Sequence, residues 1–293
     1  MLSAPAAATS GNVPAPRRGR PIKGPSALGN DWRRFLQLAV TLAVMDFKLR
    51  FFGSALGYLW QLIRPLMLFG VLYVVFTEFV RLGGDVKFYP ALLLTGVVLF
   101  QFFGEATSRS LSSITEREGL IRKIDFPRLA VPLAVILTAY FNLVINLIAV
   151  LVFVFATGVE PRLEWLALPV LLLLLGLFAA GVGTLLAVLY VRFRDLKPIW
   201  DVVLQVTFYA SPILYPLDII PSETAQKLIP TFNPLATILV QFRHSLIDPD
   251  APNAWDAVGG AQYLLIPVAI SAGLIGLGLW LFKRQAPRLA EEL

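Results

Sequence analysis

The sequence predicts an all-α integral membrane protein, in which six transmembrane helices follow an N-terminal amphipathic helix that lies in the membrane interface. Three observations support this fold class. Of the 293 residues, 57% are hydrophobic and 15% are charged, and the mean hydropathy is +0.73. Six apolar runs are long enough to cross a hydrocarbon core of about 30 Å. Basic residues collect on one side of the resulting topology. Because soluble domains have roughly 25% charged residues, this composition excludes an ordinary cytosolic enzyme.

The N-terminal segment is expected to stay outside the membrane core. Residues 1–28 are rich in alanine, proline, glycine and serine and contain four basic residues. They lack the apolar core of a signal peptide, which indicates a disordered basic cytoplasmic tail near anionic lipid. From 30 to 52, apolar residues recur at three- and four-residue spacing, which predicts a helix. Because Asp46, Lys48 and Arg50 make insertion costly, we expect this helix to lie flat in the cytoplasmic interface.

Residues 29–293 are predicted to form a single transmembrane domain. Its spans are expected near 56–80, 89–108, 130–157, 165–191, 198–217 and 262–282. If both termini are cytoplasmic, the inner segments hold 19 lysine and arginine residues and the outer segments hold 5, so the positive-inside rule favours this orientation. The net charge of +6 therefore needs no nucleic acid as a partner. The proline-rich outer segment 218–261 predicts short helices near 223–229 and 235–247.

The sequence lacks the residue patterns of most catalytic sites. It contains no cysteine and one histidine, His244, so a thiolate or histidine metal cluster is excluded. No G-x-x-x-x-G-K-[ST] occurs, so the chain has no P-loop for a nucleotide. Glu78 and Glu105 fall near the ends of their spans, where they make poor members of a proton relay. Any energy for transport must then come from a partner. Asn142 and Asn146, four residues apart, predict an interhelical hydrogen bond.

Aromatic residues are placed deep inside two predicted spans. In the first and the fifth span, eight of them lie near a common face or near the inner end: Tyr58, Trp60, Phe69, Tyr73, Phe76, Trp200, Phe208 and Tyr215. An interfacial belt would place such residues at the two membrane surfaces only. Two alternatives stay open. The rings pack against lipid or the protein core, or they line a path along which sugar rings stack.

Five short segments, in order along the chain, resemble the permease subunits of polysaccharide-exporting ABC transporters, which export O-antigen, teichoic acid and related glycans. They are 53–60 (Gly-Ser-Ala-Leu-Gly-Tyr-Leu-Trp) with Pro65, 119–123 (Gly-Leu-Ile-Arg-Lys) with 126–128 (Phe-Pro-Arg), 192–196 (Arg-Phe-Arg-Asp-Leu), 211–215 (Ser-Pro-Ile-Leu-Tyr) and 233–235 (Asn-Pro-Leu). The resemblance covers about residues 30–285. It implies a homodimer in the bacterial cytoplasmic membrane that moves a lipid-linked polysaccharide outward. It also implies two copies of a P-loop ATPase subunit, which bind ATP and magnesium, while this chain binds no cofactor.

The same resemblance implies roles for particular residues. The segment after the second span would dock in a groove of the ATPase, with Leu120 and Ile121 as the buried contact. A polar rim would surround them, formed by Glu116, Arg117, Glu118, Arg122 and Lys123. The interfacial helix would lie at the cytoplasmic entrance, where the glycan is received. The first and fifth spans would line the channel, so the eight aromatic residues become candidate glycan contacts.

Other functions remain open from the sequence. An ABC permease for a lipid, drug or other small solute would share this topology. A membrane enzyme acting on lipid-linked sugar would use Asp248 and Asp250, or Asp195 and Asp201, as its acids. Pro249, between the first two, favours a turn instead. A structural membrane anchor would need fewer spans. The sequence does not identify the glycan.

Overall fold

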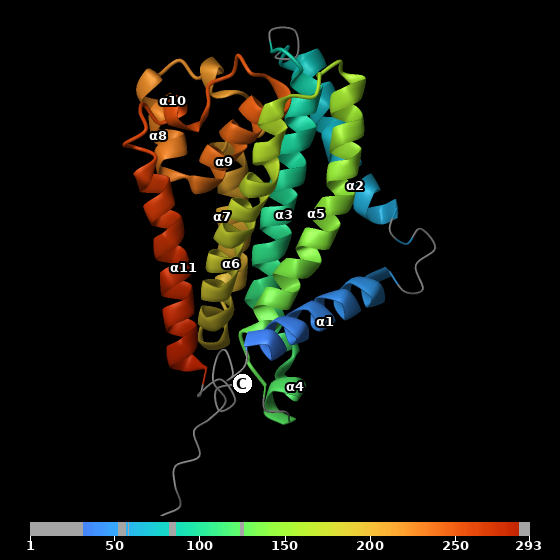
Figure 1. The fold of residues 1–293 in the computed structure, drawn as a ribbon, viewed down its shortest axis with the longest axis vertical. Helices are drawn as coiled ribbons and strands as arrows, with labels where there is room; N and C mark the ends of the chain where they lie inside the picture. The colour runs from blue at the N-terminus through green and yellow to red at the C-terminus, as the bar shows by residue number, and fades with distance from the viewer. Residues whose placement is uncertain (1–31, 52–56, 58, 82–85, 124–125, 287–293) are drawn as a thin grey trace, which may run out of the picture.

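The computed structural model describes residues 32–51, 57, 59–81, 86–123 and 126–286. In this part of the chain every regular element is a helix. α1 (Trp32–Phe51) and the short α4 (Glu118–Lys123) lie at one end of the molecule (Figure 1). At the other end are α8 (Glu223–Phe232), α9 (Pro234–Phe242) and α10 (Ala254–Ala257). The long helices run between these two ends.

Five helical segments of the described chain are long and apolar enough to cross a membrane. They are α2 (Leu59–Val74) with the π-helical turn Val75–Phe79, α3 (Tyr89–Glu116), α5 (Ala130–Ala156), α6 (Leu168–Arg192) with the preceding 3-10 turn Leu163–Ala167, and α11 (Leu265–Gln285). Helices suit hydrocarbon because each satisfies its backbone hydrogen bonds internally. The all-α, multi-pass architecture predicted from the sequence is therefore confirmed.

The fifth predicted span, 198–217, is shorter in the structure than expected. α7 (Leu196–Ala210) has 15 residues, which reach about 22 Å at roughly 1.5 Å per residue and fall short of a ~30 Å hydrocarbon core. Pro212 explains the early end, because a proline disfavours the α conformation in the preceding residue. Ser211 accordingly has φ −101° and ψ 152°. By length, α7 alone is not a sixth spanning helix.

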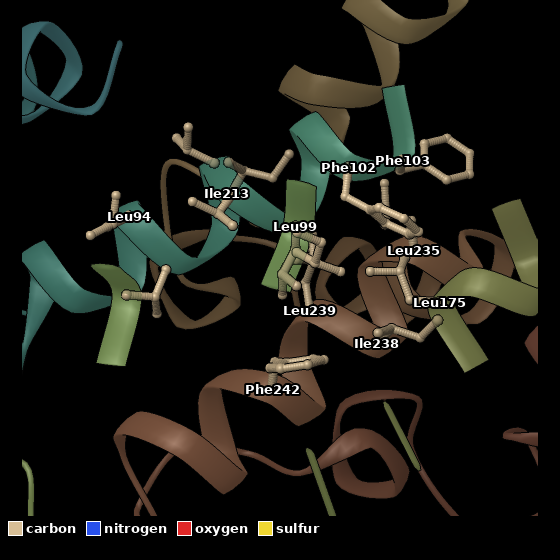
Figure 2. Close-up of a cluster of buried hydrophobic side chains, with 14 of the residues drawn as sticks. Leu94, Leu99, Phe102, Phe103, Leu175, Ile213, Leu235, Ile238, Leu239 and Phe242 are labelled. Atoms are coloured by element: carbon tan, nitrogen blue, oxygen red, sulfur yellow. The ribbon is translucent and has the colours of Figure 1, made fainter. Parts of the chain in front are cut away.

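α3 is the most deeply buried of the long helices. In its most apolar 18-residue window 72% of the residues are buried, against 11% for α2. α2, α5, α6 and α7 all pack against α3. Figure 2 shows Leu94 and Leu99 of α3 in one buried cluster with Ile213, which follows α7, and with Leu239 and Phe242 of α9. The core therefore joins the spanning helices to the short helices at one end.

Side-chain caps begin the short helices that the sequence predicts in the 218–261 segment. The Ser222 hydroxyl accepts a hydrogen bond from the backbone N–H of Ala225 at 3.3 Å, at the start of α8. The Asn233 side chain accepts from the N–H of Leu235 at 3.1 Å, at the start of α9. Both are preferred N-cap residues, because they satisfy donors that have no partner within the helix. The prediction of short helices here is confirmed.

α1 packs along α5 with one of its faces. Phe35, Ala39 and Ala43 are buried, and the Thr138 hydroxyl of α5 lies within hydrogen-bond reach of the Ala43 carbonyl oxygen, at 3.3 Å. Other large apolar side chains of the helix are exposed: Trp32, Leu36, Val40, Met45 and Leu49. α1 therefore presents apolar surface both to the protein and away from it.

α6 and α11 approach each other closely through glycines. A Cβ atom added to Gly278 of α11 would lie 2.8 Å from the backbone oxygen of Gly181 and 2.8 Å from the Thr184 hydroxyl oxygen. Contacts this short require the helices to move apart. Gly276, on the same helix, is exposed, and an added Cβ would meet nothing within 4 Å.

We predict that Gly278→Ala lowers the free energy of unfolding by about 1–3 kcal/mol, because overpacking forces α11 away from α6. The matched control Gly276→Ala should leave stability unchanged or raise it by up to about 1 kcal/mol, since alanine is the better helix former. Thermal unfolding of the purified variants in detergent measures both. Equal midpoints for the two variants would contradict the tight α6–α11 contact.

Candidate functional site

The short helix α4 follows α3 at the end of the molecule where α1 lies (Figure 1). α3 ends at Glu116, and the next residue, Arg117, forms an ion pair with Asp46 of α1. Glu116 and Gly119 are exposed, and Leu120 is partly exposed. α4 and its flanks therefore present a small apolar surface with charged neighbours, on a segment tied to α1.

Ile121 has a different position from Leu120. Its side chain is 3% exposed and belongs to a buried cluster with Phe35 of α1 and Phe282 of α11. The sequence suggested Leu120 and Ile121 together as docking contacts, whereas the structure places Ile121 in the chain's own core. It anchors α4 to the body of the protein. Glu118 is half-buried. The other two residues predicted for the polar rim, Arg122 and Lys123, belong to α4, but the structure does not describe their side chains.

The aromatic set of α2 packs against the neighbouring helices. Phe69 is buried, and its ring stacks on Tyr73 with 5.7 Å between centroids. The same ring meets Phe153 of α5 edge-on at 5.2 Å. Tyr73 and Phe76 are partly buried against the main core. In a single copy of the chain, Phe69 thus has a packing role, while Tyr73 and Phe76 keep part of their surface accessible.

The aromatic set of α7 packs against α3. The Trp200 indole N–H donates a hydrogen bond to the Thr107 hydroxyl at 3.1 Å. Phe208 meets Phe100 of α3 edge-on, with 5.0 Å between ring centroids. The Tyr215 hydroxyl donates to the backbone carbonyl of residue 209 at 2.9 Å. These contacts orient the rings, and all three side chains remain half-buried.

The two aromatic sets face different neighbours within one chain. α2 packs mainly on α3 and α5, whereas α7 packs on α3 and α6. Trp60, at the start of α2, is half exposed, and Tyr58 lies outside the described residues. Both helices also expose apolar side chains on their outer faces: Met67, Val71 and Val74 on α2, and Ile199, Val202 and Val206 on α7.

Polar contacts hold the segment after α7, residues 211–215, against Asn233 and the start of α3. The Asn233 amide donates to the Ser211 hydroxyl at 2.8 Å, so two of the segments singled out in the sequence meet in space. The Tyr89 hydroxyl donates to the Leu214 carbonyl at 2.9 Å. Gly96 makes room for this backbone, because an added Cβ would lie 3.1 Å from a carbonyl oxygen of the segment. Sequence spacing offers no signal for these long-range contacts.

The acidic residues of the enzyme alternative are held in a turn or lie on the surface. The N–H of Asp250 donates to a carboxylate oxygen of Asp248 at 3.2 Å, which confirms the predicted turn. Lys87 Nζ lies 3.1 Å from Asp250 and 3.7 Å from Asp248, and its hydrogen bond to Asp250 raises the pKa of Lys87. Asp195 and Asp201 are exposed. Within the described ranges, no group of three or more His, Cys, Asp or Glu residues could hold a metal ion.

A charged network that sequence reasoning missed joins three helices. A carboxylate oxygen of Glu105 on α3 accepts from the Asn142 amide of α5 at 2.9 Å and from Arg109 at 3.3 Å. The same oxygen pairs with Arg50 of α1. The interhelical hydrogen bond predicted for Asn142 is confirmed. Its partner lies 37 residues away, so only the packing of α3 against α5 reveals it.

Comparison with known proteins matches most of the chain. Residues 37–247 match the model of the ABC-2 type transporter family. The chain is 29% identical over 259 residues to the O-antigen export system permease protein RfbA of Klebsiella pneumoniae, across 87% of this chain and 95% of that protein. A protein of the same name from Myxococcus xanthus is 28% identical over 256 residues, with the same coverage of 87% and 95%. The polysialic acid transport protein KpsM of Escherichia coli is 26% identical over 250 residues, across 84% of this chain and 93% of that protein. Because the family match spans more than half of its length, the chain belongs to the ABC-2 type transporter family.

Proposed function

We propose that this chain is the membrane-spanning permease subunit of an ATP-driven ABC exporter. It moves a lipid-linked polysaccharide of the O-antigen, teichoic acid or galactan type across the bacterial cytoplasmic membrane. The observation that carries this proposal is the near full-length similarity to permeases named for O-antigen export, on a multi-pass helical fold. The chain contains no P-loop, so ATP and magnesium bind to a separate ATPase subunit and this chain performs no covalent chemistry.

The exporter is expected to cross the membrane six times, with both termini in the cytoplasm. α7 and the chain that follows it, 211–217, form the fifth crossing. Non-helical backbone is tolerated at membrane depth where protein encloses it, and Ile213 and Leu214 in this segment are buried. The inner segments hold 19 lysine and arginine residues and the outer segments hold 5, which supports cytoplasmic termini. The exposed apolar side chains of α1 fit a helix that lies in the cytoplasmic interface.

A second copy of the chain would complete the translocation path. α7 has no buried residue, and only 11% of the spanning window that contains α2 is buried, so both helices have surface available for a partner. A homodimer that joins these faces would bring the α2 and α7 aromatic sets of two chains toward one path. Sugar rings would then stack on the accessible parts of Trp60, Tyr73, Phe76, Trp200, Phe208 and Tyr215.

α4 is the candidate contact for the ATPase subunit, one copy per permease. Leu120 would enter the groove of the ATPase as the apolar contact, with charged residues around it. Ile121 would transmit the movement of α4 to the cluster that contains Phe35 and Phe282. The ion pair between Arg117 and Asp46 adds a second connection to α1. Docking at α4 would therefore shift α1 and α3 together.

The direct test reconstitutes the purified permease with a candidate P-loop ATPase subunit from the same organism and supplies a lipid-linked glycan. We expect the two proteins to copurify and the glycan to raise ATP hydrolysis. An ATPase subunit without its P-loop lysine is the control, since it should assemble without hydrolysis. Stimulation by a small lipid or drug instead of the glycan would favour the small-solute permease. Sugar chemistry on the glycan without any ATPase would favour the membrane enzyme.

Leu120→Asp is predicted to reduce ATPase binding and glycan export by about tenfold or more, because an unpaired carboxylate would enter an apolar contact. The variant should fold, since Leu120 is partly exposed. The matched control is Leu163→Asp, which introduces the same charge at an 84% exposed leucine. Leu163 begins the 3-10 turn before α6, which contacts the turn Arg243–Ile247 that follows α9. Copurification and export assays measure both variants. Wild-type export by Leu120→Asp would remove α4 from the ATPase interface.

Tyr73→Ala with Phe76→Ala is predicted to lower glycan export by about tenfold, because two stacking surfaces are lost. Assembly with the ATPase should persist, since both side chains are only partly buried. Trp280→Ala serves as the control, because Trp280 is an exposed aromatic residue on α11, away from α2 and α7. An equal loss of export in both variants would show a general packing defect and contradict an aromatic path.

A further inference from the structure

A polar cavity of about 390 Å³ lies between the end of α1 and the helices α2, α3 and α5. Among the described residues, four charged side chains line it: Arg50, Arg64, Glu105 and Arg109. Three are basic and one is acidic, so the lining has a formal excess of two positive charges. Arg64 is exposed and the Arg109 side chain is 40% exposed, so these guanidinium groups can reach an anionic ligand that enters the cavity.

Arg64 carries the positive charge of this lining that no described carboxylate balances. It lies between one and two turns into α2, an otherwise apolar helix that begins at Leu59. Among the described residues Arg64 forms no ion pair. Glu105, the carboxylate of the cavity, already pairs with Arg50 and Arg109. The guanidinium of Arg64 is therefore available to an anionic ligand.

Amide groups in the same lining also lack partners. The Nε2 atom of Gln61 is buried and donates no hydrogen bond in the described structure. The Oδ1 atoms of Asn142 and Asn146 are buried and accept none. A half-turn of the Asn146 amide about its last bond exchanges the oxygen and the NH₂ group, so that the NH₂ group faces the cavity as a donor. Buried polar groups are normally satisfied, so these amides indicate a polar ligand.

We propose that this cavity binds a phosphate group at the head of a lipid. An arginine guanidinium group can donate two parallel hydrogen bonds to the oxygens of one phosphate in a bidentate geometry, and amide N–H groups add further donors. The inference rests on the proposed function in one respect: in an exporter of lipid-linked glycan, the phosphate is the one that joins lipid to sugar. An anionic membrane phospholipid offers the same chemistry and is the second source.

The position of the cavity suits a head group. Arg50 is at the end of α1, and Gln61 is in the first turn of α2. Arg109 lies within the last eight residues of α3, which ends where α4 begins. The cavity thus opens near the end of the bundle that holds α1 and α4, where a charged head group would meet the protein while its tail stays in lipid. A sugar ring fits less well, since Phe102 is the sole aromatic residue among the described residues that line the cavity.

Native mass spectrometry of the full-length permease, purified in a maltoside detergent that contains no phosphate, tests this site. The probes are undecaprenyl diphosphate, the uncharged undecaprenol and phosphatidylglycerol. We expect undecaprenyl diphosphate to bind saturably and undecaprenol to bind at least about tenfold more weakly. Arg64→Gln should weaken diphosphate binding about tenfold, and Arg64→Lys, which keeps the charge, should weaken it less.

Lys283→Gln is the matched control, because it removes the same charge from an exposed position in the last turn of α11. It should bind all three probes as the wild type does. Equal binding of undecaprenol and its diphosphate, or equal weakening by Arg64→Gln and Lys283→Gln, would overturn the phosphate site.

Competition between the probes identifies the source of the phosphate. Displacement of the diphosphate by equimolar phosphatidylglycerol would support the site and assign it to membrane phospholipid. Resistance to phosphatidylglycerol would support the site and assign it to the exported lipid. The measurement needs no ATPase subunit. Phosphate binding without glycan-stimulated ATP hydrolysis would therefore reject the proposed exporter function alone, and export without phosphate binding would reject this site alone.

Discussion

The burial of α3 is the constraint on which the rest of the structure depends. Four other helices, α2, α5, α6 and α7, use it as a common packing surface. Its apolar residues reach the cluster formed by Ile213 and α9, so the helix joins the spanning bundle to the short helices at one end. Its polar residues are equally important, since Glu105 connects to α1 and α5 and Thr107 to α7. α3 therefore positions both aromatic sets and the polar cavity.

Ionic contacts tie α1 to this central helix. Arg50 pairs with Glu105 inside the bundle, and Asp46 pairs with Arg117 where α3 ends. One acidic partner lies on α3 and the other on α1, so the two ion pairs join the two helices in both directions. Ile121 of α4 packs against the same α1 through Phe35. α1, α4 and the polar cavity are thus parts of one connected unit, through which the proposed docking at α4 would reach the cavity.

Sequence patterns predicted the elements better than their contacts. Apolar runs identified five of the spanning helices and the α8 and α9 region, because hydrophobicity and proline punctuation are local properties. They misjudged the length of α7, since Pro212 ends the helix inside an apolar run. The four-residue spacing of Asn142 and Asn146 predicted an interhelical hydrogen bond, and in the structure Asn142 donates to Glu105. The deep aromatic residues were recognised, but their packing was not: Phe69 rests on Phe153, more than 80 residues away in sequence.

The sequence alone determined that the chain is a multi-pass helical membrane protein without a P-loop, because composition, run length and motif absence need no knowledge of contacts. It also marked α4 as a candidate docking segment. Only the tertiary structure decided which face of α4 is accessible, since Leu120 is partly exposed while Ile121 faces the core of the chain. It alone brought Arg50, Arg64, Glu105 and Arg109 around one cavity, because these residues come from three helices whose packing no local pattern specifies.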